Sequence, residues 1–316
     1  MGKNTLKIYG LIGYPVKHSL SPAMHNAAFR VSGINAEYRL FEVKPEELRD
    51  FLNNPGIEFK DKDARLVRAG DIEGFNITIP HKVKAKEILI PNDLNELRDK
   101  PTELIKSVLW YRALSGAINT IRRDIKGYYN TDAPGFMRSL EGDLKFEVKN
   151  KNVLLFGCGG AGRAVIAAIS HIQSGAKKIY IYDSNSSVRD LAKIHFSQFA
   201  QLEEKLEFIT FGEIREIVRN CQLLVNASPV GMKEGDPSVI DKNLLHKSLS
   251  VYDVVYNRQT QLIKDAQERK ILWAGGLGML LYQGVAAWEL WTERQADDNI
   301  IRAMREALKQ EIGRSV

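Results

Sequence analysis

Cysteine is scarce in this chain, which has only Cys158 and Cys221 among its 316 residues. Two cysteines are too few for a disulfide framework or a metal cluster, so we expect a protein of a reducing compartment. Long hydrophobic runs are also missing: the longest nearly uncharged stretch, "AGGLGMLLYQGVAAW", is shorter than the roughly 20 residues of a membrane span. The N-terminus has no apolar signal core, and Leu6 stands where myristoylation requires Ser or Thr. These absences together predict a cytoplasmic protein.

Charge of one sign is not concentrated anywhere along the chain. There are 45 Lys and Arg against 39 Asp and Glu, giving a net charge of +6, but basic and acidic residues are interspersed. A protein that binds nucleic acid commonly shows a basic stripe with interleaved aromatic residues, and the sequence has none. We therefore expect a surface that mildly attracts small anions, and no nucleic-acid partner.

Low-complexity tracts and repeats are absent as well. The composition, with 44% hydrophobic and 27% charged residues, is that of an ordinary globular protein. A chain of 316 residues is typical of about two domains, each able to bury a core. Two domains imply a cleft in which a ligand could bind.

The second half of the chain alternates apolar strands with helices. A strand at 152–156, the turn "GCGGAG", a helix at 163–173 and a strand at 178–183 form one βαβ unit. The alternation continues with strands at 206–211, 223–228 and 250–256 and helices at 212–221 and 259–270. This order predicts a doubly wound parallel sheet of the Rossmann type, which binds dinucleotides.

The first half is a second α/β layer. It shows strands at 6–13, 36–43 and 74–80, helices near 21–33 and at 45–53, a polar helical stretch at 88–112, and a hairpin within 115–132. A helix from Gly135 leads into the second domain, and the two helices at 279–292 and 299–312 return to the first. We therefore predict an α/β protein with a substrate domain at 1–131 and 276–316 and a Rossmann domain at 132–275.

The turn "GCGGAG" matches the dinucleotide fingerprint G-x-G-x-x-G through Gly157, Gly159 and Gly162. Gly157 permits the tight turn, Gly159 lets the backbone approach a pyrophosphate, and Gly162 allows close packing of the helix. The helix N-terminus adds unpaired N–H groups and the positive end of the helix dipole. The alternative is a purely structural turn between strand and helix.

Asp183 ends the next strand, where the fingerprint expects an acid about 20 residues further on. A carboxylate at this position accepts hydrogen bonds from the adenosine ribose and repels a 2′-phosphate. No arginine follows until Arg189, which should already lie on the next helix. The sequence therefore favours NAD over NADP, with a helix N-cap as the alternative role of Asp183.

Lys82 and Asp132 are the candidates for proton transfer. Lys82 follows the strand end "NITIPH", and a lysine beside a cleft can pass a proton to or from an alcohol. Asp132 ends the predicted hairpin next to the crossover into the second domain. A solvated lysine at a helix start and an aspartate that caps a helix are the alternatives.

The stretch "GYPVKHSLSPAMHN" places Ser19 and Ser21 just after a strand. Read alone, it predicts a helix capped by Ser21 with Pro22 as its first residue. The histidines His18, His25 and His81 lack a carboxylate cluster, so we expect no metal site. A serine nucleophile is unsupported, because the strained nucleophile elbow is missing.

Taken together, several motifs resemble the shikimate dehydrogenase family, which includes the quinate/shikimate dehydrogenases. They occur in family order across nearly the whole chain: "GYPVKHSLSPAMHN", "NITIPHK", "GAINT", "NTDAPG", "GCGGAGR", "ASPVGM", "DVVYN" and "GLGMLLYQG". The resemblance implies a first domain that binds a hydroxylated ring carboxylate and a second that binds the nicotinamide cofactor, in the chorismate pathway of aromatic amino acid biosynthesis.

The resemblance also implies roles for individual residues. Lys82 and Asp132 would be the catalytic pair, with Lys82 as the proton relay while hydride passes between the ring carbon and the nicotinamide. Ser19 and Ser21 would bind the substrate carboxylate and Tyr256 would close over it. The other implied substrate contacts are Thr78, Asn119 and Gln283, and the implied cofactor residues are Gly157, Gly159, Gly160, Ala161, Gly162, Asp183 and Gly276.

The chain departs from the family pattern at several places. Asp183, Ser184 and Asn185 stand where NADP-type members usually carry Asn-Arg-Thr, which supports NAD. Arg258 replaces a common proline after Tyr256, and the loop there is one residue shorter. Ala133 replaces a usual glycine, and the segment between Lys82 and Gly116 is longer than is common.

We therefore predict an oxidoreductase that interconverts shikimate and 3-dehydroshikimate, and also quinate and 3-dehydroquinate as a possible second pair, with NAD favoured. The first alternative is a strictly NADP-dependent biosynthetic shikimate dehydrogenase. The second is a protein that binds shikimate or quinate without turnover. The sequence leaves a monomer and a homodimer equally open.

Overall fold

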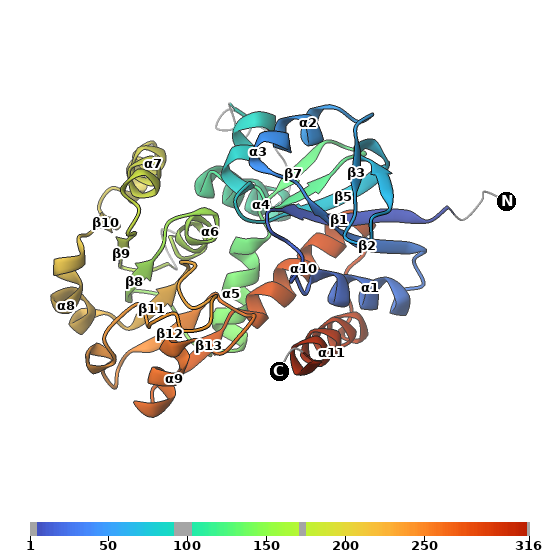
Figure 1. Ribbon diagram of the computed structural model, residues 1–316. Helices are drawn as coiled ribbons and strands as arrows, with labels where there is room; N and C mark the ends of the chain where they lie inside the picture. Colours follow the sequence, from blue (N-terminus) through green and yellow to red (C-terminus); the bar gives the residue numbers. More distant parts are fainter. Residues whose placement is uncertain (1–4, 92–102, 171–174, 315–316) are drawn as a thin grey trace. The chain divides into compact units, whose positions relative to one another are not determined.

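The computed structural model describes residues 5–91, 103–170 and 175–314 (Figure 1). Contacts within the chain divide it into two compact units. Unit 1 comprises Met1–Thr131 and Gln283–Val316, and unit 2 comprises Asp132–Tyr282. The second boundary therefore falls inside the helix α10 (Leu277–Thr292). Each unit is described below by itself.

Unit 1 contains a five-stranded sheet with the strand order β2-β1-β5-β6-β7. Its strands are β1 (Lys7–Gly13), β2 (Ala36–Glu42), β5 (Ile72–Ile77), β6 (Thr120–Arg122) and β7 (Gly127–Tyr129). The strand β1 pairs in parallel with β2 and β5, whereas β6 and β7 form the predicted antiparallel hairpin. The parallel strands bring the loops that follow β1 and β5 to the same edge of the sheet.

Helices cover this sheet. They are α1 (Ser21–Val31), α2 (Leu48–Asn53), α3 (Lys82–Leu89), α4 (Glu103–Ser115) and α11 (Asp298–Arg314). The helix α11 packs along α1, as Figure 1 shows, and Trp291 of α10 contacts Tyr9 and Tyr38 of the sheet. The C-terminal helices thus return to unit 1 from Gln283 onward, whereas the sequence placed this boundary after residue 275. Part of the helical stretch expected at 88–112 lies outside the described residues, which resume at α4.

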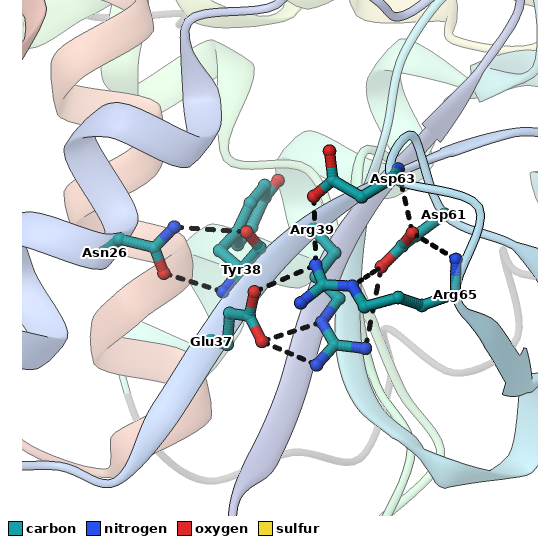
Figure 2. Close-up of polar contacts among 7 residues, drawn as sticks. All are labelled: Asn26, Glu37, Tyr38, Arg39, Asp61, Asp63 and Arg65. Atoms are coloured by element: carbon teal, nitrogen blue, oxygen red, sulfur yellow. Dashed lines mark hydrogen bonds and ion pairs between the residues drawn. The ribbon is translucent and has the colours of Figure 1, made fainter.

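A small hairpin of β3 (Glu58–Lys60) and β4 (Leu66–Arg68) was not predicted from the sequence. Its turn is organised by Asp61, whose Oδ1 accepts the backbone N–H groups of Asp63 and Arg65 and whose Oδ2 accepts Nε of Arg65 at 2.6 Å. Figure 2 shows this ion-pair cluster beside Glu37 and Arg39 of β2. Strands of three residues carry too little hydrophobic periodicity to be recognised locally.

Unit 2 contains the predicted doubly wound sheet. Its six strands have the order β10-β9-β8-β11-β12-β13, and every pairing is parallel. The strands are β8 (Asn152–Phe156), β9 (Lys178–Tyr182), β10 (Leu206–Phe208), β11 (Leu223–Asn226), β12 (Ser250–Asp253) and β13 (Trp273–Gly275). The order reverses at β8, so the loops after β8 and β11 flank the switch point at which doubly wound sheets bind ligands.

The helices of unit 2 are α5 (Asp132–Gly142), α6 (Gly160–Ile169), α7 (Ser186–Phe196), α8 (Ile214–Ile217) and α9 (Gln261–Glu268). Two helix predictions were wrong in detail. The helix α5 begins at Asp132 rather than at Gly135, because Pro134 is tolerated in a first turn, where N–H groups have no intrahelical partner. The helix expected at 212–221 is three short turns, in which α8 lies between 3₁₀ turns at Phe211–Glu213 and Val218–Asn220.

No helix in the described ranges is long and apolar enough to cross a membrane.

Candidate active site

The loop after β1 carries the two serines singled out in the sequence. Ser19 is partly exposed and Ser21 is buried, and their hydroxyl oxygens lie 3.2 Å apart. The backbone N–H of Ser21 donates to Ser19 Oγ at 3.3 Å. The predicted cap at Ser21 was wrong: Leu20 is the N-cap of α1, and no side chain caps this helix. The two hydroxyls are thus held together by the turn itself.

The loop after β5 lies directly beside this serine loop. Its Ile79 carbonyl accepts the backbone N–H of Tyr14 at 2.9 Å. A Cβ built on Gly13 would lie 2.4 Å from Cγ2 of Thr78, so only glycine allows the two loops to approach this closely. Thr78 and Ser19 therefore belong to neighbouring loops at the carboxyl edge of the sheet.

Lys82 is the first residue of α3 and is partly buried. Its carbonyl accepts the backbone N–H of Ile118 at 3.1 Å, which ties the helix start to the entrance of β6. The preceding His81 is buried and lies 2.6 Å from the Val43 carbonyl through Nε2, and burial lowers the pKa of this histidine. His81 is therefore scaffold, and it fixes the turn that presents Lys82.

Asn119 lies just before β6 in a buried polar network. Its Oδ1 accepts the Thr131 backbone N–H at 2.7 Å, and its Nδ2 donates to Thr131 Oγ1 at 2.9 Å and to Gln283 Oε1 at 3.5 Å. Asn119, Thr131 and Gln283 are all buried. Within unit 1, Thr78 and Asn119 thus come from neighbouring loops, and Lys82 and Gln283 come from the helices α3 and α10.

In unit 2, the glycine loop forms the turn between β8 and α6. Gly157 has φ of +90°, and its built Cβ would lie 2.8 Å from the Ala227 backbone. A Cβ on Gly162 would lie 2.0 Å from the Gly157 carbonyl oxygen. A Cβ on Gly159, by contrast, would meet no atom within 4 Å. Packing therefore explains Gly157 and Gly162, whereas the space at Gly159 suits a ligand that approaches the backbone.

The N-terminus of α6 adds to this cradle. Gly159 is its N-cap and no side chain caps it, so its first N–H groups face outward. Gly160 and Ala161, its next residues, are only partly buried. These residues fit a dinucleotide pyrophosphate, because backbone donors and the helix dipole both favour an anion at this place.

Asp183 follows β9 and does not cap the next helix. Asn185 is the N-cap of α7, and its side chain accepts the N–H groups of Ser187 and Val188. Asp183 Oδ2 accepts the Cys158 N–H at 2.9 Å, and Oδ1 accepts the Asn185 N–H at the same distance. The carboxylate is thereby oriented beside the glycine loop, which is the place expected for a ribose-binding acid.

Asp253 is a buried acid that sequence reasoning did not single out. It ends β12, accepts Asn226 Nδ2 at 3.0 Å, and binds the Thr260 hydroxyl at 2.6 Å. Burial raises its pKa to about 6. Asn226 also binds the Val230 carbonyl, so the pair fixes the loops after β11 and β12, the second of which carries Tyr256. The motifs "ASPVGM" and "DVVYN", which lie at the start of these two loops, were the sequence features that could have pointed to Asp253.

Two further predicted residues belong to unit 2. A Cβ on Gly276 would lie 1.9 Å from the Val254 carbonyl oxygen, so packing alone requires a glycine there. Asp132 is the buried first residue of α5 and directly follows Thr131, the partner of Asn119.

Among the residues that the structure describes, no three His, Cys, Asp or Glu side chains are grouped to hold a metal ion.

Comparison with known proteins gives the family. Residues 11–93 match the model of the shikimate dehydrogenase substrate binding domain, and residues 276–309 match that of the shikimate 5'-dehydrogenase C-terminal domain. A curated shikimate dehydrogenase (NADP(+)) of Methanopyrus kandleri is 35% identical over 311 residues, which cover 96% of each chain. This chain belongs to the shikimate dehydrogenase family. Membership confirms the predicted enzyme class, an NAD(P)-dependent oxidoreductase.

Solved structures support the same fold. A crystal structure of a shikimate dehydrogenase in complex with NADP+ has a TM-score of 0.74 and 31% identity, covering 97% of this chain and 96% of that one. The enzyme of Listeria monocytogenes, solved with shikimate and NAD, has a TM-score of 0.71 and 27% identity, covering 95% and 96%. Both agree with the predicted architecture of two α/β parts with C-terminal helices.

Proposed function

We propose that this protein interconverts shikimate and 3-dehydroshikimate by hydride transfer with a nicotinamide dinucleotide. The observation that carries the proposal is the pairing of two features in one family member. Unit 1 contains paired serine hydroxyls and a buried network of amide side chains, and unit 2 forms a glycine cradle with room at Gly159. The first suits a hydroxylated carboxylate and the second suits a pyrophosphate.

Neutral donors hold the substrate in this proposal. Ser19 and Ser21 bind the carboxylate, because their paired hydroxyls can each donate to one anionic oxygen without a salt bridge. Thr78, Asn119 and Gln283 contact the ring hydroxyls, and Tyr256 is the substrate residue of unit 2. A ring with several hydroxyls is thereby matched by several fixed polar groups, which is how polar sites achieve specificity.

Lys82 and Asp132 are the proposed catalytic residues. Oxidation of a secondary alcohol removes a proton from the hydroxyl and a hydride from the same carbon. The bound nicotinamide supplies the hydride acceptor. The Lys82 amine takes the hydroxyl proton as the carbonyl forms and returns it in the reverse direction, and Asp132 supports it as the partner acid. In both directions the lysine acts at the substrate oxygen.

For the cofactor, the Asp183 carboxylate favours NAD. It is held beside the glycine loop by two backbone N–H groups, and a carboxylate has about four acceptor positions, which leaves room for ribose hydroxyls. Its charge opposes a 2′-phosphate. The second candidate is NADP, because curated relatives such as the Methanopyrus kandleri enzyme are named as NADP(+) enzymes. The names of these relatives support the hypothesis of an NADP-dependent enzyme better than the hypothesis of an NAD-dependent one.

The test is a matrix of steady-state rates with shikimate and quinate against NAD+ and NADP+. We expect turnover of shikimate and a higher kcat/KM with NAD+. An NADP+ preference of about tenfold, or about 1.4 kcal/mol, would establish the second candidate instead. Asp183→Asn, which keeps the size of the side chain, should raise kcat/KM for NADP+ more than for NAD+. Binding of shikimate without any change in nicotinamide absorbance would show a binding protein rather than an enzyme.

A further inference from the structure

The hydroxyl of Tyr38 lies outside every motif that points to substrate or cofactor. Tyr38 belongs to the edge strand β2 and is only 2% exposed. Its hydroxyl donates a 2.7 Å hydrogen bond to Oδ1 of Asn76, which lies on β5. Because β1 separates β2 from β5, the phenol reaches across β1 to make this bond. Tyr38 is thereby coupled to a strand with which it does not pair.

The neighbours of Asn76 determine which way its carboxamide points. Its nitrogen lies 3.2 Å from the backbone carbonyl oxygen of Asn119 and 2.9 Å from Thr120 Oγ1. A backbone carbonyl only accepts, so Nδ2 must lie on that side and Oδ1 must face Tyr38. The Tyr38 hydroxyl is therefore the donor, and phenylalanine at this position would leave a buried acceptor without that bond.

The orientation of the Asn119 carboxamide is likewise determined by a neighbour that can only donate or only accept. The Thr131 backbone N–H only donates, and it lies 2.7 Å from Asn119 Oδ1. Thr120 Oγ1 donates to that same oxygen at 3.2 Å while it accepts from Asn76. Thr120 thus links the two carboxamides. Oδ1 of Asn119 has at least two donors within the protein, and Nδ2 donates to Thr131 Oγ1 at 2.9 Å and to Gln283 Oε1 at 3.5 Å. A ring oxygen would therefore meet Nδ2 in place of the longer contact, the one to Gln283.

Tyr38 itself is held at its backbone and at its ring. Figure 2 shows the Asn26 carboxamide of α1 facing the Tyr38 backbone, where it accepts the N–H at 2.8 Å and donates to the carbonyl at 3.2 Å. The His25 ring stacks on the Tyr38 ring with centroids 4.3 Å apart. With its backbone and ring fixed, the hydroxyl has a defined position, which is what a positioning residue requires.

We infer that Tyr38, acting through Asn76 and Thr120, positions the Asn119 carboxamide so that its Nδ2 group meets a ring oxygen of the substrate. Tyr38 touches no substrate in this arrangement and is a positioning residue. The inference rests on the proposed function, in which Asn119 binds a ring hydroxyl. It adds that the Asn119 carboxamide, whose orientation the Thr131 N–H sets, is also held in position by a chain of hydrogen bonds that begins on the far strand β2.

The test variant is Tyr38→Phe, and the chain offers a matched control in Tyr9→Phe. Tyr9 is the direct strand partner of Tyr38 on β1, is also buried, and contacts the same Trp291 ring. We expect Tyr38→Phe to raise the KM for shikimate about fivefold to tenfold, with the cofactor KM unchanged. Tyr9→Phe should leave both KM values within about twofold of wild type.

Shikimate analogues that each lack one ring hydroxyl separate positioning from a general loss of structure. Asn119→Ala identifies the hydroxyl that Asn119 binds, because this variant leaves kcat/KM for the matching analogue unchanged. Tyr38→Phe should then also spare that analogue while it impairs shikimate. If Tyr38→Phe does not fold, Thr120→Val removes the hydrogen bonds through which Thr120 links Asn76 and Asn119, without changing β2. We expect this variant, too, to impair shikimate and to spare the matching analogue.

Two results would overturn the inference: equal kinetics for Tyr38→Phe and Tyr9→Phe, or a Tyr38→Phe penalty that persists on the matching analogue. Absence of shikimate turnover by the wild-type protein would instead refute the proposed function.

Discussion

Lys82 stands on a backbone that is fixed on both sides of the residue. It begins α3, and the turn before it is pinned by the buried His81 and by the bond between the Ile118 N–H and the Lys82 carbonyl. A long lysine stem is flexible, so a fixed backbone at its base reduces the space in which the amine moves. The proposed proton transfer needs that restriction, because an acid or base acts only within hydrogen-bond reach.

Lys82→Ala should therefore lower kcat by about 100-fold or more, with a much smaller change in the KM for shikimate. Lys84→Ala is the matched control, because Lys84 lies on the same helix, is exposed, and pairs with Glu87 at 2.9 Å. That control should keep nearly full activity. Steady-state rates over a range of shikimate concentrations measure both effects. Normal turnover of Lys82→Ala would remove the lysine from the mechanism.

At the scale of one element, the turn between β8 and α6 separates structural from ligand-related glycines. Gly162 is required because its Cβ would clash with the Gly157 carbonyl, which cannot move without breaking the turn. Gly159 faces open space and has φ of −69°, which suits any L-residue. The two glycines of this motif are thus explained by different physical causes: packing at Gly162 and space for a ligand at Gly159.

Gly162→Ala should destabilise the protein by about 1–3 kcal/mol, through overpacking against backbone. Gly159→Ala should change stability by less than about 1 kcal/mol, because it alters only a helix cap. The same variant should weaken cofactor binding about tenfold or more, since the added methyl group occupies the space for the pyrophosphate. Thermal unfolding and cofactor titration measure the two effects. Unchanged cofactor affinity in Gly159→Ala would contradict the proposed cradle.

For the whole molecule, two buried titratable groups change the stability of their own units in opposite directions as the pH falls. In unit 1, burial of His25 lowers its pKa from 6.5 to about 3, so the unfolded chain binds the proton first and stability falls as pH drops below about 6.5. In unit 2, burial of Asp253 raises its pKa from 3.8 to about 6. Its contribution is full below about pH 3.8 and is lost as pH rises through 6.

Lowering the pH from about 7 to about 4.5 should therefore weaken unit 1 relative to unit 2. Hydrogen exchange, corrected for the intrinsic effect of pH, should show greater loss of protection in β1 and β2 than in β8 and β11. Asp253→Asn is the matched control: it keeps the size of the side chain, removes the titration, and should abolish the acid response of unit 2 alone. Earlier loss of protection in unit 2 would contradict the assignment.

Short stretches of sequence were enough to predict most of the strands and helices. Strand and helix periodicity, and the placement of glycines between them, indicated the alternating elements of 152–256, and the parallel sheet of unit 2 confirms them. The glycine loop was recognisable because its motif and its context lie within a few consecutive residues. Helix ends were less certain: Asp132, Ser21 and the broken turns around α8 all depend on which neighbour supplies a hydrogen bond.

The contacts that orient the candidate site have a different origin. Tyr38, Asn76 and Asn119 are far apart in the chain and meet only through the strand order β2-β1-β5-β6 and its register. Asp183 does not cap α7 because Asn185 is the N-cap of that helix, and the backbone geometry of the folded chain determines which residue takes this position. Local patterns specify the elements because periodicity acts over consecutive residues. The orientation of buried amides depends on partners from distant segments, and only the folded chain brings those partners within hydrogen-bond distance.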